Sequence, residues 1–310
     1  MTKTVVAEGY GGPEVLAVEE VALPQPGQGQ VVVEVRAAGT NPFDYKRYSG
    51  QMGNDPADLP VRLGLEVSGV VAEAPSGASG FTGPLRAGDE VVAAPISGGY
   101  AEQVVADAAD VGHKPASIGF EQAAGLLLAG GTAWHLLVHT GVGAGDTVLI
   151  HGASGGVGLL AVQLAVARGA TVIATASEAR HDQLRRYGAI PVVYGDGLTD
   201  RVRAIGTVDA ALDLVGSDEA LETSVELVPD VARIATINGF ARAPELGIAV
   251  LTGADGGDEI RAAARPELLA LAGSGKLEVT VDRAFPLEEA AEAHRYLQTG
   301  HARGKVVLLP

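Results

Sequence analysis

A glycine-rich segment near the middle of the chain has the residues and spacing of a phosphate-binding loop. The apolar run Val148-Leu149-Ile150 leads into Ala153-Ser154-Gly155-Gly156-Val157-Gly158, and an apolar-periodic stretch from Leu159 to Ala167 follows. A strand, a tight turn and a helix start in this order direct backbone N–H groups and the positive end of a helix dipole at a pyrophosphate. The segment predicts a dinucleotide site, and the alternative is a turn that binds nothing. Ala153 stands where the pattern G-x-G-x-x-G has its first glycine.

The strand-like run after this helix, Thr171 to Ser177, ends without an acidic residue. Folds that prefer NAD have Asp or Glu at this place, where the carboxylate binds the ribose 2′-hydroxyl. The hydroxyl of Ser177 and the guanidinium of Arg180 could hold a 2′-phosphate instead, with a charge-assisted hydrogen bond worth about 1.5 to 3 kcal/mol. We therefore expect NADPH to bind more tightly than NADH. In the alternative interpretation Glu178 is a displaced ribose ligand and Arg180 is solvated.

The composition excludes several other kinds of chemistry. The chain has no cysteine, so a disulfide framework, a thiolate nucleophile and a Cys-ligated metal or cluster are excluded. Its seven histidines are scattered and do not indicate a metal site. The 38 acidic and 22 basic residues give a net charge of -16 without a basic block, which argues against nucleic acid as a partner.

Neither a signal peptide nor a membrane helix is apparent in the sequence. The first residues, Met1 to Val6, lack the apolar core of a signal peptide, and no apolar run reaches roughly 18 residues. We expect a cytoplasmic protein without a membrane partner.

The elements that must position these residues fall into an α/β arrangement. Short β-branched runs broken by Gly and Pro occupy residues 1–116, which is typical of a small β barrel or sandwich. Strand-like runs alternate with helical stretches over residues 117–265, which predicts right-handed crossovers and a doubly wound parallel sheet. The segment 266–310 returns to β texture at Leu277 to Val281 and Lys305 to Leu309, around a helix at Leu287 to Leu297.

Several short motifs together resemble the medium-chain dehydrogenase/reductase superfamily, and within it the zinc-free quinone oxidoreductase branch related to ζ-crystallin. The likeness extends over nearly the whole chain. Besides the loop Ala153 to Gly158, it is carried by Ala38-Gly39-Thr40-Asn41-Pro42-Phe43-Asp44-Tyr45-Lys46, Gly64-Leu65-Glu66-Val67-Ser68-Gly69-Val70-Val71, Gly88-Asp89-Glu90-Val91, Gly99-Tyr100-Ala101-Glu102 and Gly130-Gly131-Thr132-Ala133. One departure is Val166, where the branch usually has a basic or small residue shortly after Gln163.

The resemblance implies a GroES-like β domain over 1–116, a Rossmann NADP(H)-binding domain over 117–265 and a C-terminal return to the first domain over 266–310. It also implies the absence of catalytic zinc. Zinc alcohol dehydrogenases of the superfamily have Cys where Asn41 stands and His where Leu65 stands, and Glu66 alone cannot form a tetrahedral site.

Cofactor contacts follow from the same resemblance. Gly155, Gly156, Val157 and Gly158 correspond to the pyrophosphate loop, and Ser177, Arg180 and Tyr194 to the pocket for the 2′-phosphate and adenine ribose. Thr132, Asn238 and Thr252 are candidates near the nicotinamide. Tyr194 could instead pack on the sheet, and Asn238-Gly239 could be turn chemistry after a strand.

Without zinc, the substrate oxygen needs hydrogen-bond donors, and Asn41, Tyr45 and Lys46 are the candidate catalytic residues. The alternative is that Asn41-Pro42 forms a turn and Lys46-Arg47 is a solvated pair. Asp44 is expected to be a structural acceptor rather than a general base.

The hypothesis is that the chain is an enzyme that uses NADPH to reduce a quinone or the C=C bond of an α,β-unsaturated carbonyl. The second hypothesis is an NADPH-binding sensor or crystallin-like structural protein without turnover. The resemblance suggests a homodimer, whose edge strand could be the run Leu246 to Leu251.

Overall fold

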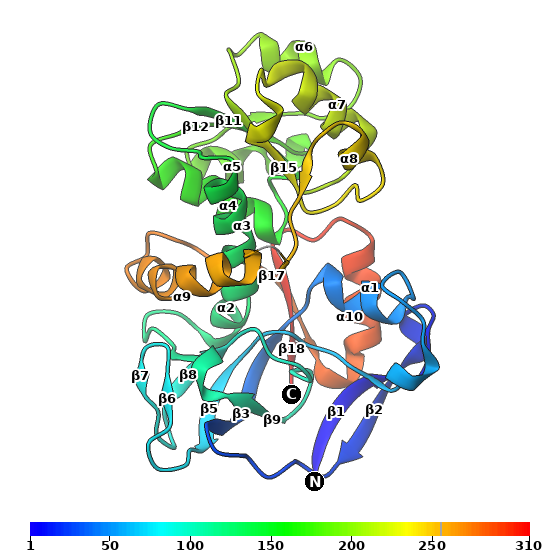
Figure 1. The fold of residues 1–310 in the computed structure, drawn as a ribbon, viewed down its shortest axis with the longest axis vertical. Coiled ribbons are helices and arrows are strands. Elements are labelled where there is room, and N and C mark those ends of the chain that lie inside the picture. The colour runs from blue at the N-terminus through cyan, green and yellow to red at the C-terminus, as the bar shows by residue number, and fades with distance from the viewer. Residues whose placement is uncertain (255) are drawn as a thin grey trace. The chain divides into compact units, whose positions relative to one another are not determined.

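The computed structural model describes residues 1–254 and 256–310, and it divides the chain into two compact units (Figure 1). The first unit consists of Met1–Leu128 and Pro266–Pro310, and the second of Ala129–Arg265. The two junctions fall within helices α3 (Leu127–His139) and α9 (Gly257–Gly273).

The first junction lies after the change of sequence texture at residue 116. Helix α2 (Phe120–Ala124) packs against strands β3 (Gln30–Gly39) and β5 (Val67–Glu73) of the first unit. The Ser68 hydroxyl of β5 donates to the Phe120 carbonyl at 2.5 Å. The Leu128 N–H donates to Glu66 Oε2 at 3.0 Å. Residue 116 therefore lies shortly before α2 and α3, whereas the packing boundary follows Leu128.

The main sheet of the first unit has the strand order β10-β8-β5-β3-β18-β17, and β9 also pairs with β3. A smaller sheet has the order β2-β1-β4, and β6 pairs with β7. The strands from the N-terminal segment are β1 (Thr2–Ala7), β2 (Leu16–Val21), β3 (Gln30–Gly39), β4 (Val61–Arg62), β5 (Val67–Glu73), β6 (Ser79–Gly80), β7 (Gly83–Pro84), β8 (Glu90–Ala93), β9 (Gln103–Asp107) and β10 (Val111–His113). The short helix α1 (Pro42–Tyr48) follows β3 directly.

The C-terminal segment completes the core of the first unit. It contributes β17 (Val281–Pro286), α10 (Ala290–Gln298) and β18 (Lys305–Leu309). Strand β18 pairs antiparallel with the end of β3, with Val307 opposite Gly39 and Leu308 opposite Ala38. Val306 and Leu308 lie in one buried cluster with valines of β3, β5 and β8. The return of the chain to the first unit thus places residues after 300 beside the end of β3.

The predicted strand at Leu277 to Val281 is wrong in its position, because the strand is β17, Val281–Pro286. Its partner β18 begins at Lys305, and the register sets Val281 opposite Lys305. Leu277 and Val279 are apolar because they are buried in the core, although they do not belong to a strand.

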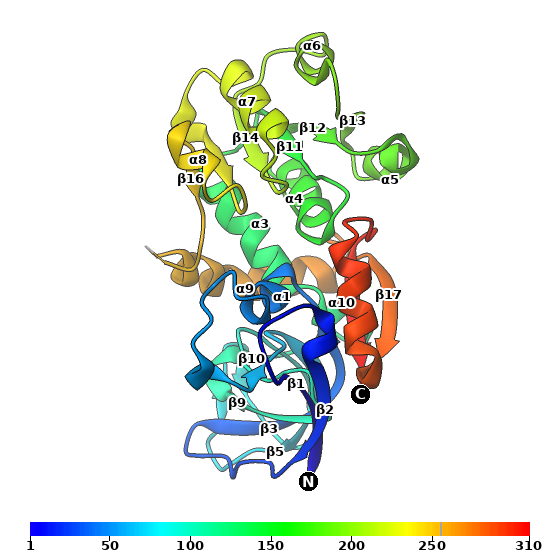
Figure 2. The same ribbon diagram turned by 90° about the vertical axis from the view of Figure 1, so that its right-hand side faces the viewer.

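The second unit is built on a parallel sheet of strand order β13-β12-β11-β14-β15-β16. Helices cover both faces, with α4 and α5 on one side and α7 and α8 on the other (Figure 2). Helix α4 is apolar around its whole circumference and is buried from Gly158 to Ala165, as expected of a core helix. The elements are β11 (Thr147–His151), α4 (Gly156–Ala167), β12 (Thr171–Thr175), α5 (His181–Arg186), β13 (Ile190–Val192), α6 (Leu198–Arg203), β14 (Ala210–Asp213), α7 (Asp218–Leu227), β15 (Ile234–Thr236), α8 (Arg242–Glu245) and β16 (Ala249–Val250).

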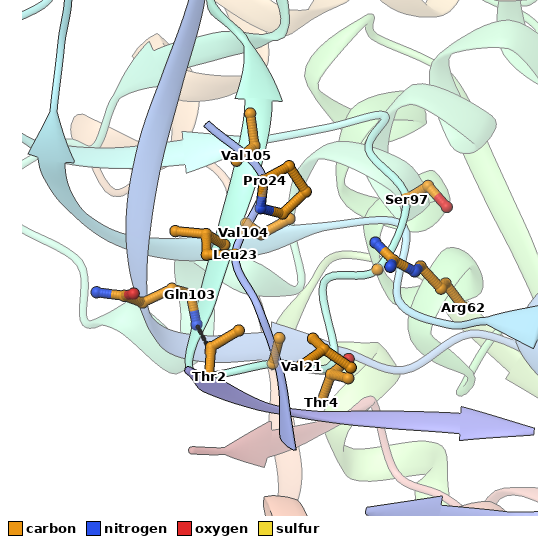
Figure 3. Close-up of a pocket in the computed structure, with 12 residues that line it drawn as sticks. Thr2, Thr4, Val21, Leu23, Pro24, Arg62, Ser97, Gln103, Val104 and Val105 are labelled. Atoms are coloured by element: carbon orange, nitrogen blue, oxygen red, sulfur yellow. Dashed lines mark hydrogen bonds between the residues drawn. The ribbon is translucent and has the colours of Figure 1, made fainter. Parts of the chain in front are cut away.

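A small pocket of about 90 Å³ lies in the first unit between β1, the segment after β2 and β9 (Figure 3). Its lining includes Thr2, Leu23, Arg62, Ser97 and Gln103, and none of the candidate site residues. In the part of the chain that the structure describes, no helix combines the length and the apolar character of a membrane span.

Candidate cofactor and catalytic site

The glycine loop of the second unit makes its sharp turn one residue before the motif begins. Gly152 has a left-handed φ of +69°, which favours glycine, whereas Ala153 is fully buried. The Ala153 N–H donates to the Thr175 carbonyl of β12 at 3.1 Å, and the Gly155 N–H donates to the Gly152 carbonyl at 3.2 Å. Because Gly152 makes the turn, alanine is tolerated at the motif's first glycine position.

Gly158 is the glycine of this loop for which space is most restricted. A Cβ atom there would lie 2.3 Å from the Gly152 carbonyl oxygen and 2.7 Å from backbone carbons of Ala153. Gly155, the N-cap of α4, would place its Cβ 3.5 Å from the Gly152 carbonyl oxygen, an ordinary contact. The first N–H groups of a helix have no partner within the helix, so the start of α4 can bind an anion. The loop therefore fits the diphosphate of a dinucleotide.

Four neighbouring strands of the parallel sheet each end in a buried polar side chain, and the four side chains form a row. Parallel pairing aligns Thr175 of β12, His151 of β11, Asp213 of β14 and Thr236 of β15 at one sheet edge. Each is at most 2% exposed. Asp213 accepts hydrogen bonds from the N–H groups of Val215 and Gly216 and, at 2.5 Å, from the Thr236 hydroxyl. The row fixes the loops that leave the carboxyl edge of the sheet, where open α/β sheets bind their ligands.

His151 of this row is a fully buried imidazole. Burial lowers its pKa to about 4, although the neighbouring Asp213 carboxylate acts in the opposite direction. Its Nδ1 lies 3.3 Å from the Thr175 hydroxyl, and its Nε2 is buried without a hydrogen-bond partner. His151 is therefore neutral near pH 7 and directly precedes the turn at Gly152.

The predicted 2′-phosphate residues follow β12 and β13, whose carboxyl ends are adjacent in the sheet. Ser177 is the N-cap of a single 3₁₀ turn, Glu178–Arg180, and its side chain makes no capping hydrogen bond. Ser177 and Arg180 are half-buried, whereas Tyr194 is 56% exposed. The exposure of Tyr194 disfavours the alternative that it packs on the sheet.

The three candidates for the nicotinamide half lie on separate elements of the second unit. Thr132 is half-buried on α3. Asn238 follows β15, and its Nδ2 donates to the Leu214 carbonyl at 3.0 Å, which ties two loops of the carboxyl edge together. Thr252 is exposed after β16, where its hydroxyl accepts from the Ala254 N–H. A direct role of these residues toward a cofactor remains a prediction.

The candidate catalytic residues of the first unit lie at the start of α1 and on it. Asn41 is its N-cap and is 6% exposed, whereas Tyr45 and Lys46 are half-buried. Burial raises the pKa of Tyr45 and lowers that of Lys46. Their contact with substrate stays a prediction, and Tyr45 and Lys46 are the more accessible donors.

The Asn41 amide is held inside the first unit by Lys305. The Lys305 ammonium donates to Asn41 Oδ1 at 2.6 Å, to Glu66 Oε1 at 2.8 Å and to the Thr40 carbonyl at 3.0 Å. Asn41 Nδ2 in turn donates to Glu66 Oε1 at 3.2 Å. Both ends of the amide are therefore engaged in a buried network.

A second buried network begins at Asp44, which is fully buried on α1. The Asp44 carboxylate accepts from the N–H groups of Asn41 and Gly64 and from the Tyr100 hydroxyl. Burial raises the pKa of Asp44 to about 6, although these hydrogen bonds act in the opposite direction. The contacts favour the interpretation of Asp44 as a structural acceptor.

His294 of α10 extends this network. Its Nε2 lies 3.0 Å from the Tyr100 oxygen, and its Nδ1 lies 2.8 Å from the Tyr48 oxygen. Because the Tyr100 proton goes to Asp44, Nε2–H must donate to Tyr100. Burial lowers the pKa of His294 to about 4, so the ring is neutral near pH 7 and its Nδ1 accepts from the Tyr48 hydroxyl.

We expect His294→Gln to flatten the dependence of stability on acid pH. In the folded state His294 stays neutral down to about pH 4, whereas in the unfolded chain it takes up a proton below its ordinary pKa of 6.5. The stability contributed by neutral His294 is thus present above pH 6.5 and lost between pH 6.5 and 4. The unfolding free energies of wild type and variant should converge by up to about 3 kcal/mol over this window, as measured by urea unfolding at several pH values.

The exposed His139 provides the matched control, because His139→Gln leaves the buried network intact. Asp44, whose pKa is raised, contributes in the opposite direction, so the difference between variant and wild type is the informative quantity. A constant difference from pH 6.5 to 4 would contradict the assignment.

The functional residues that the sequence analysis missed are polar residues at the ends of apolar strands. His151 and Asp213 each end a run of buried strand residues, and Lys305 begins one. A charged or titratable residue next to an otherwise buried strand was the available signal. Parallel pairing of the predicted strands would then have placed His151 and Asp213 side by side.

The chain matches two family models. Residues 27–142 match the alcohol dehydrogenase GroES-like domain, and residues 187–308 match the zinc-binding dehydrogenase model.

Relatives and solved structures of similar length also match. A quinone oxidoreductase of Pseudomonas aeruginosa is 33% identical, with 100% of each chain covered. An NADPH-dependent alkenal/one oxidoreductase, chloroplastic, of Arabidopsis thaliana is 32% identical over 99% of this chain and 79% of its own length. The structure of the Escherichia coli quinone oxidoreductase complexed with NADPH is 30% identical and superimposes with a TM-score of 0.85 over all of both chains.

The zinc implied by the name of one family model does not fit the residues around Glu66. Zinc requires Cys, His or carboxylate ligands in tetrahedral arrangement. Glu66 has the Lys305 ammonium at 2.8 Å and the Asn41 amide at 3.2 Å, and a cation already neutralises its charge. Within residues 1–254 and 256–310, no group of three or more His, Cys, Asp and Glu side chains could hold a metal ion.

Proposed function

Because this chain belongs to the zinc-free quinone oxidoreductase branch of the medium-chain dehydrogenase/reductase superfamily, we propose that it reduces a quinone or the C=C bond of an α,β-unsaturated carbonyl with NADPH. The observation that carries the proposal is the loop Gly152–Gly158, whose backbone leaves no room for a side chain at Gly158. A loop of this kind, whose last residues form the first turn of the buried helix α4, is suited to bind a diphosphate.

The division of labour follows from the chemistry of the cofactor. NADPH supplies the hydride when bound, so the chain has to hold the cofactor and stabilise negative charge on the substrate oxygen. Residues 153–158 are suited to the diphosphate, and Ser177 and Arg180 to the 2′-phosphate. Tyr45 and Lys46, half-buried on α1, are donors suited to the substrate oxygen.

Turnover tests the proposal against the alternative of a binding protein without activity. Oxidation of NADPH is followed with one panel of quinones and one panel of enones. We expect turnover with at least one panel, since the relatives named above are oxidoreductases. Binding of NADPH without consumption by either panel would instead support the sensor or crystallin-like hypothesis.

We expect Arg180→Ala to reduce the preference for NADPH over NADH by about tenfold. The lost charge-assisted hydrogen bond is worth about 1.5 kcal/mol, and each decade of affinity corresponds to about 1.4 kcal/mol. The affinity for NADH, which lacks the 2′-phosphate, should stay unchanged in the same titrations. Arg186→Ala, at an exposed arginine of α5, is the matched control. An equal loss for both dinucleotides would show that Arg180 does not contact the 2′-phosphate.

We also infer a homodimer and a cytoplasmic location. Strand β16 (Ala249–Val250) is the edge of the parallel sheet and lies within the apolar run Leu246 to Leu251. An open edge can pair with the same edge of a second copy. Light scattering after size exclusion should give twice the chain mass for the wild type and the mass of one chain for Val250→Pro. A monomeric wild type would refute the dimer.

Cell fractionation tests the proposed cytoplasmic location.

A further inference from the structure

We propose that Lys305 is a positioning residue whose ammonium takes the place of a metal ion in the first unit and fixes Asn41 at the start of α1. The ammonium contacts three oxygens, Asn41 Oδ1, Glu66 Oε1 and the Thr40 carbonyl, at 2.6, 2.8 and 3.0 Å. We further propose that these oxygens form a cation site of their own, with an affinity for small alkylammonium ions when the lysine side chain is removed.

The burial of the groups shows that this is not a surface ion pair. The side chains of Lys305 and Glu66 are 5% and 2% exposed, and Asn41 is 6% exposed. A buried charge requires a partner and hydrogen bonds for its remaining donors. The three protons of the ammonium match the three oxygens, and the Glu66 carboxylate balances the charge.

The network reaches the candidate catalytic helix through Thr40 and Asn41. The Thr40 carbonyl accepts from Lys305, and the Thr40 N–H and hydroxyl both donate to the Val306 carbonyl. Two successive residues of β18 therefore hold the last residue before Asn41. Asp44 holds the Asn41 N–H from the other side at 3.0 Å. The position and direction of α1, which carries Tyr45 and Lys46, thus depend on the ammonium.

Glu66 connects the same ammonium to the following segment. Its Oε1 binds Lys305, and its Oε2 accepts from the Leu128 N–H at 3.0 Å. Gly39 has no room for a side chain, because its Cβ would lie 2.6 Å from Glu66 Oε1 and 2.2 Å from the Ala124 carbonyl oxygen. The site is closely packed and has a fixed size, so the position of a cation within it is well defined.

Removal of the side chain and its chemical replacement test the proposal. Lys305→Ala removes the atoms that propylammonium would restore. The part of the proposal that concerns turnover rests on the proposed function. We expect the kcat of Lys305→Ala to be about tenfold or more below that of the wild type. Propylammonium chloride should restore a large part of it, whereas tetramethylammonium chloride, which cannot donate a hydrogen bond, should not. NADPH affinity should stay unchanged, because the loop and the 2′-phosphate residues belong to the second unit.

Two variants serve as matched controls. Lys305→Met fills the space without a charge, so it should lose activity and gain nothing from propylammonium. Lys114→Ala removes another lysine of the first unit, whose side chain is 4% exposed and paired with Glu90 at 3.0 Å, and it should neither lose turnover nor respond to the amine. Full activity of Lys305→Ala would overturn the proposal, as would a loss in the folded variant that the amine does not recover.

A readout without turnover separates this proposal from the proposed function. Propylammonium should raise the melting temperature of Lys305→Ala and leave those of wild type and Lys305→Met unchanged. If Lys305→Ala fails to fold on its own, it is refolded with propylammonium chloride and, separately, with tetramethylammonium chloride, and we expect a folded protein with propylammonium only. Amine-dependent stabilisation with no wild-type turnover would refute the proposed function alone, and absence of stabilisation would refute the cation site.

Discussion

Gly158→Ala is expected to abolish useful binding of NADPH, with a loss of affinity of about hundredfold or more. The new Cβ would meet the Gly152 carbonyl oxygen at 2.3 Å and two Ala153 carbons at 2.7 Å, all of them backbone atoms. The loop and α4 would have to separate, which removes the N–H groups from the position of the diphosphate. A hundredfold loss of affinity corresponds to about 2.8 kcal/mol at about 1.4 kcal/mol per decade. Calorimetric titration with NADPH measures it.

The matched control for this change is Gly206→Ala in the same unit. Its Cβ would have no atom within 4 Å, and its φ lies outside the left-handed region. It should bind NADPH as the wild type does. If the folded Gly158→Ala variant bound NADPH with an affinity within about threefold of the wild-type affinity, the loop would not be the diphosphate site.

Asp44→Ala is expected to lower the free energy of unfolding by about 3 to 5 kcal/mol, a large part of a typical total of 5 to 15 kcal/mol. The change leaves three buried donors without an acceptor, namely the N–H groups of Asn41 and Gly64 and the Tyr100 hydroxyl. Each unsatisfied donor costs about 1 to 3 kcal/mol, and the costs within one network are not additive. Urea unfolding at pH 7.5 measures the loss.

Asp44→Asn and Asp182→Ala complete this experiment. Asn keeps one acceptor oxygen, and it also removes the buried charge, whose burial raises the pKa of Asp44 to about 6. Asp44→Asn should therefore lower the free energy of unfolding clearly less than Asp44→Ala does. Asp182, on α5, has a side chain that is 98% exposed, and its removal should change stability by less than about 0.5 kcal/mol. A loss of less than about 1 kcal/mol for Asp44→Ala would show that Asp44 does not organise the start of α1.

The parts of the fold that follow from local patterns were predictable from the sequence. Strand β18 begins and ends at the predicted residues, and β11 contains the apolar run Val148-Leu149-Ile150, because apolar runs bounded by glycine or polar residues define both strands. The helix after the glycine loop was predictable because it is apolar all round and long. The strand at 277–281 was not, since burial and not pairing explains the apolar residues there.

The structure of the candidate site was predictable where one segment contains it and not where distant segments meet. The loop 153–158 is a single stretch, so its turn and the start of the helix could be predicted directly, whereas its contact with a cofactor stays a prediction. The contact between Lys305 and Asn41 joins residues 264 positions apart, and it depends on β18 pairing with the end of β3. Nothing in the local sequence at either end indicates that pairing. The role of Gly152 could not be predicted because the turn lies one residue before the first position of the motif.

The zinc position of related dehydrogenases gains a physical interpretation from this chain. By the resemblance, Asn41 stands where those enzymes have Cys, and Glu66 of this chain binds an ammonium at 2.8 Å. The buried carboxylate keeps a cationic partner, so the local charge balance is preserved. In the proposed function, donors have to stabilise the charge on the substrate oxygen, and Tyr45 and Lys46 are the proposed donors.

Titration of the purified wild-type protein with NADPH and NADH in a calorimeter tests the central claim most directly. We predict one dinucleotide bound per chain, with NADPH about tenfold or more tighter than NADH, as one charge-assisted hydrogen bond to the 2′-phosphate would give. Absence of heat with both dinucleotides at saturating concentration would contradict the account, and the glycine loop would then be a turn without a ligand.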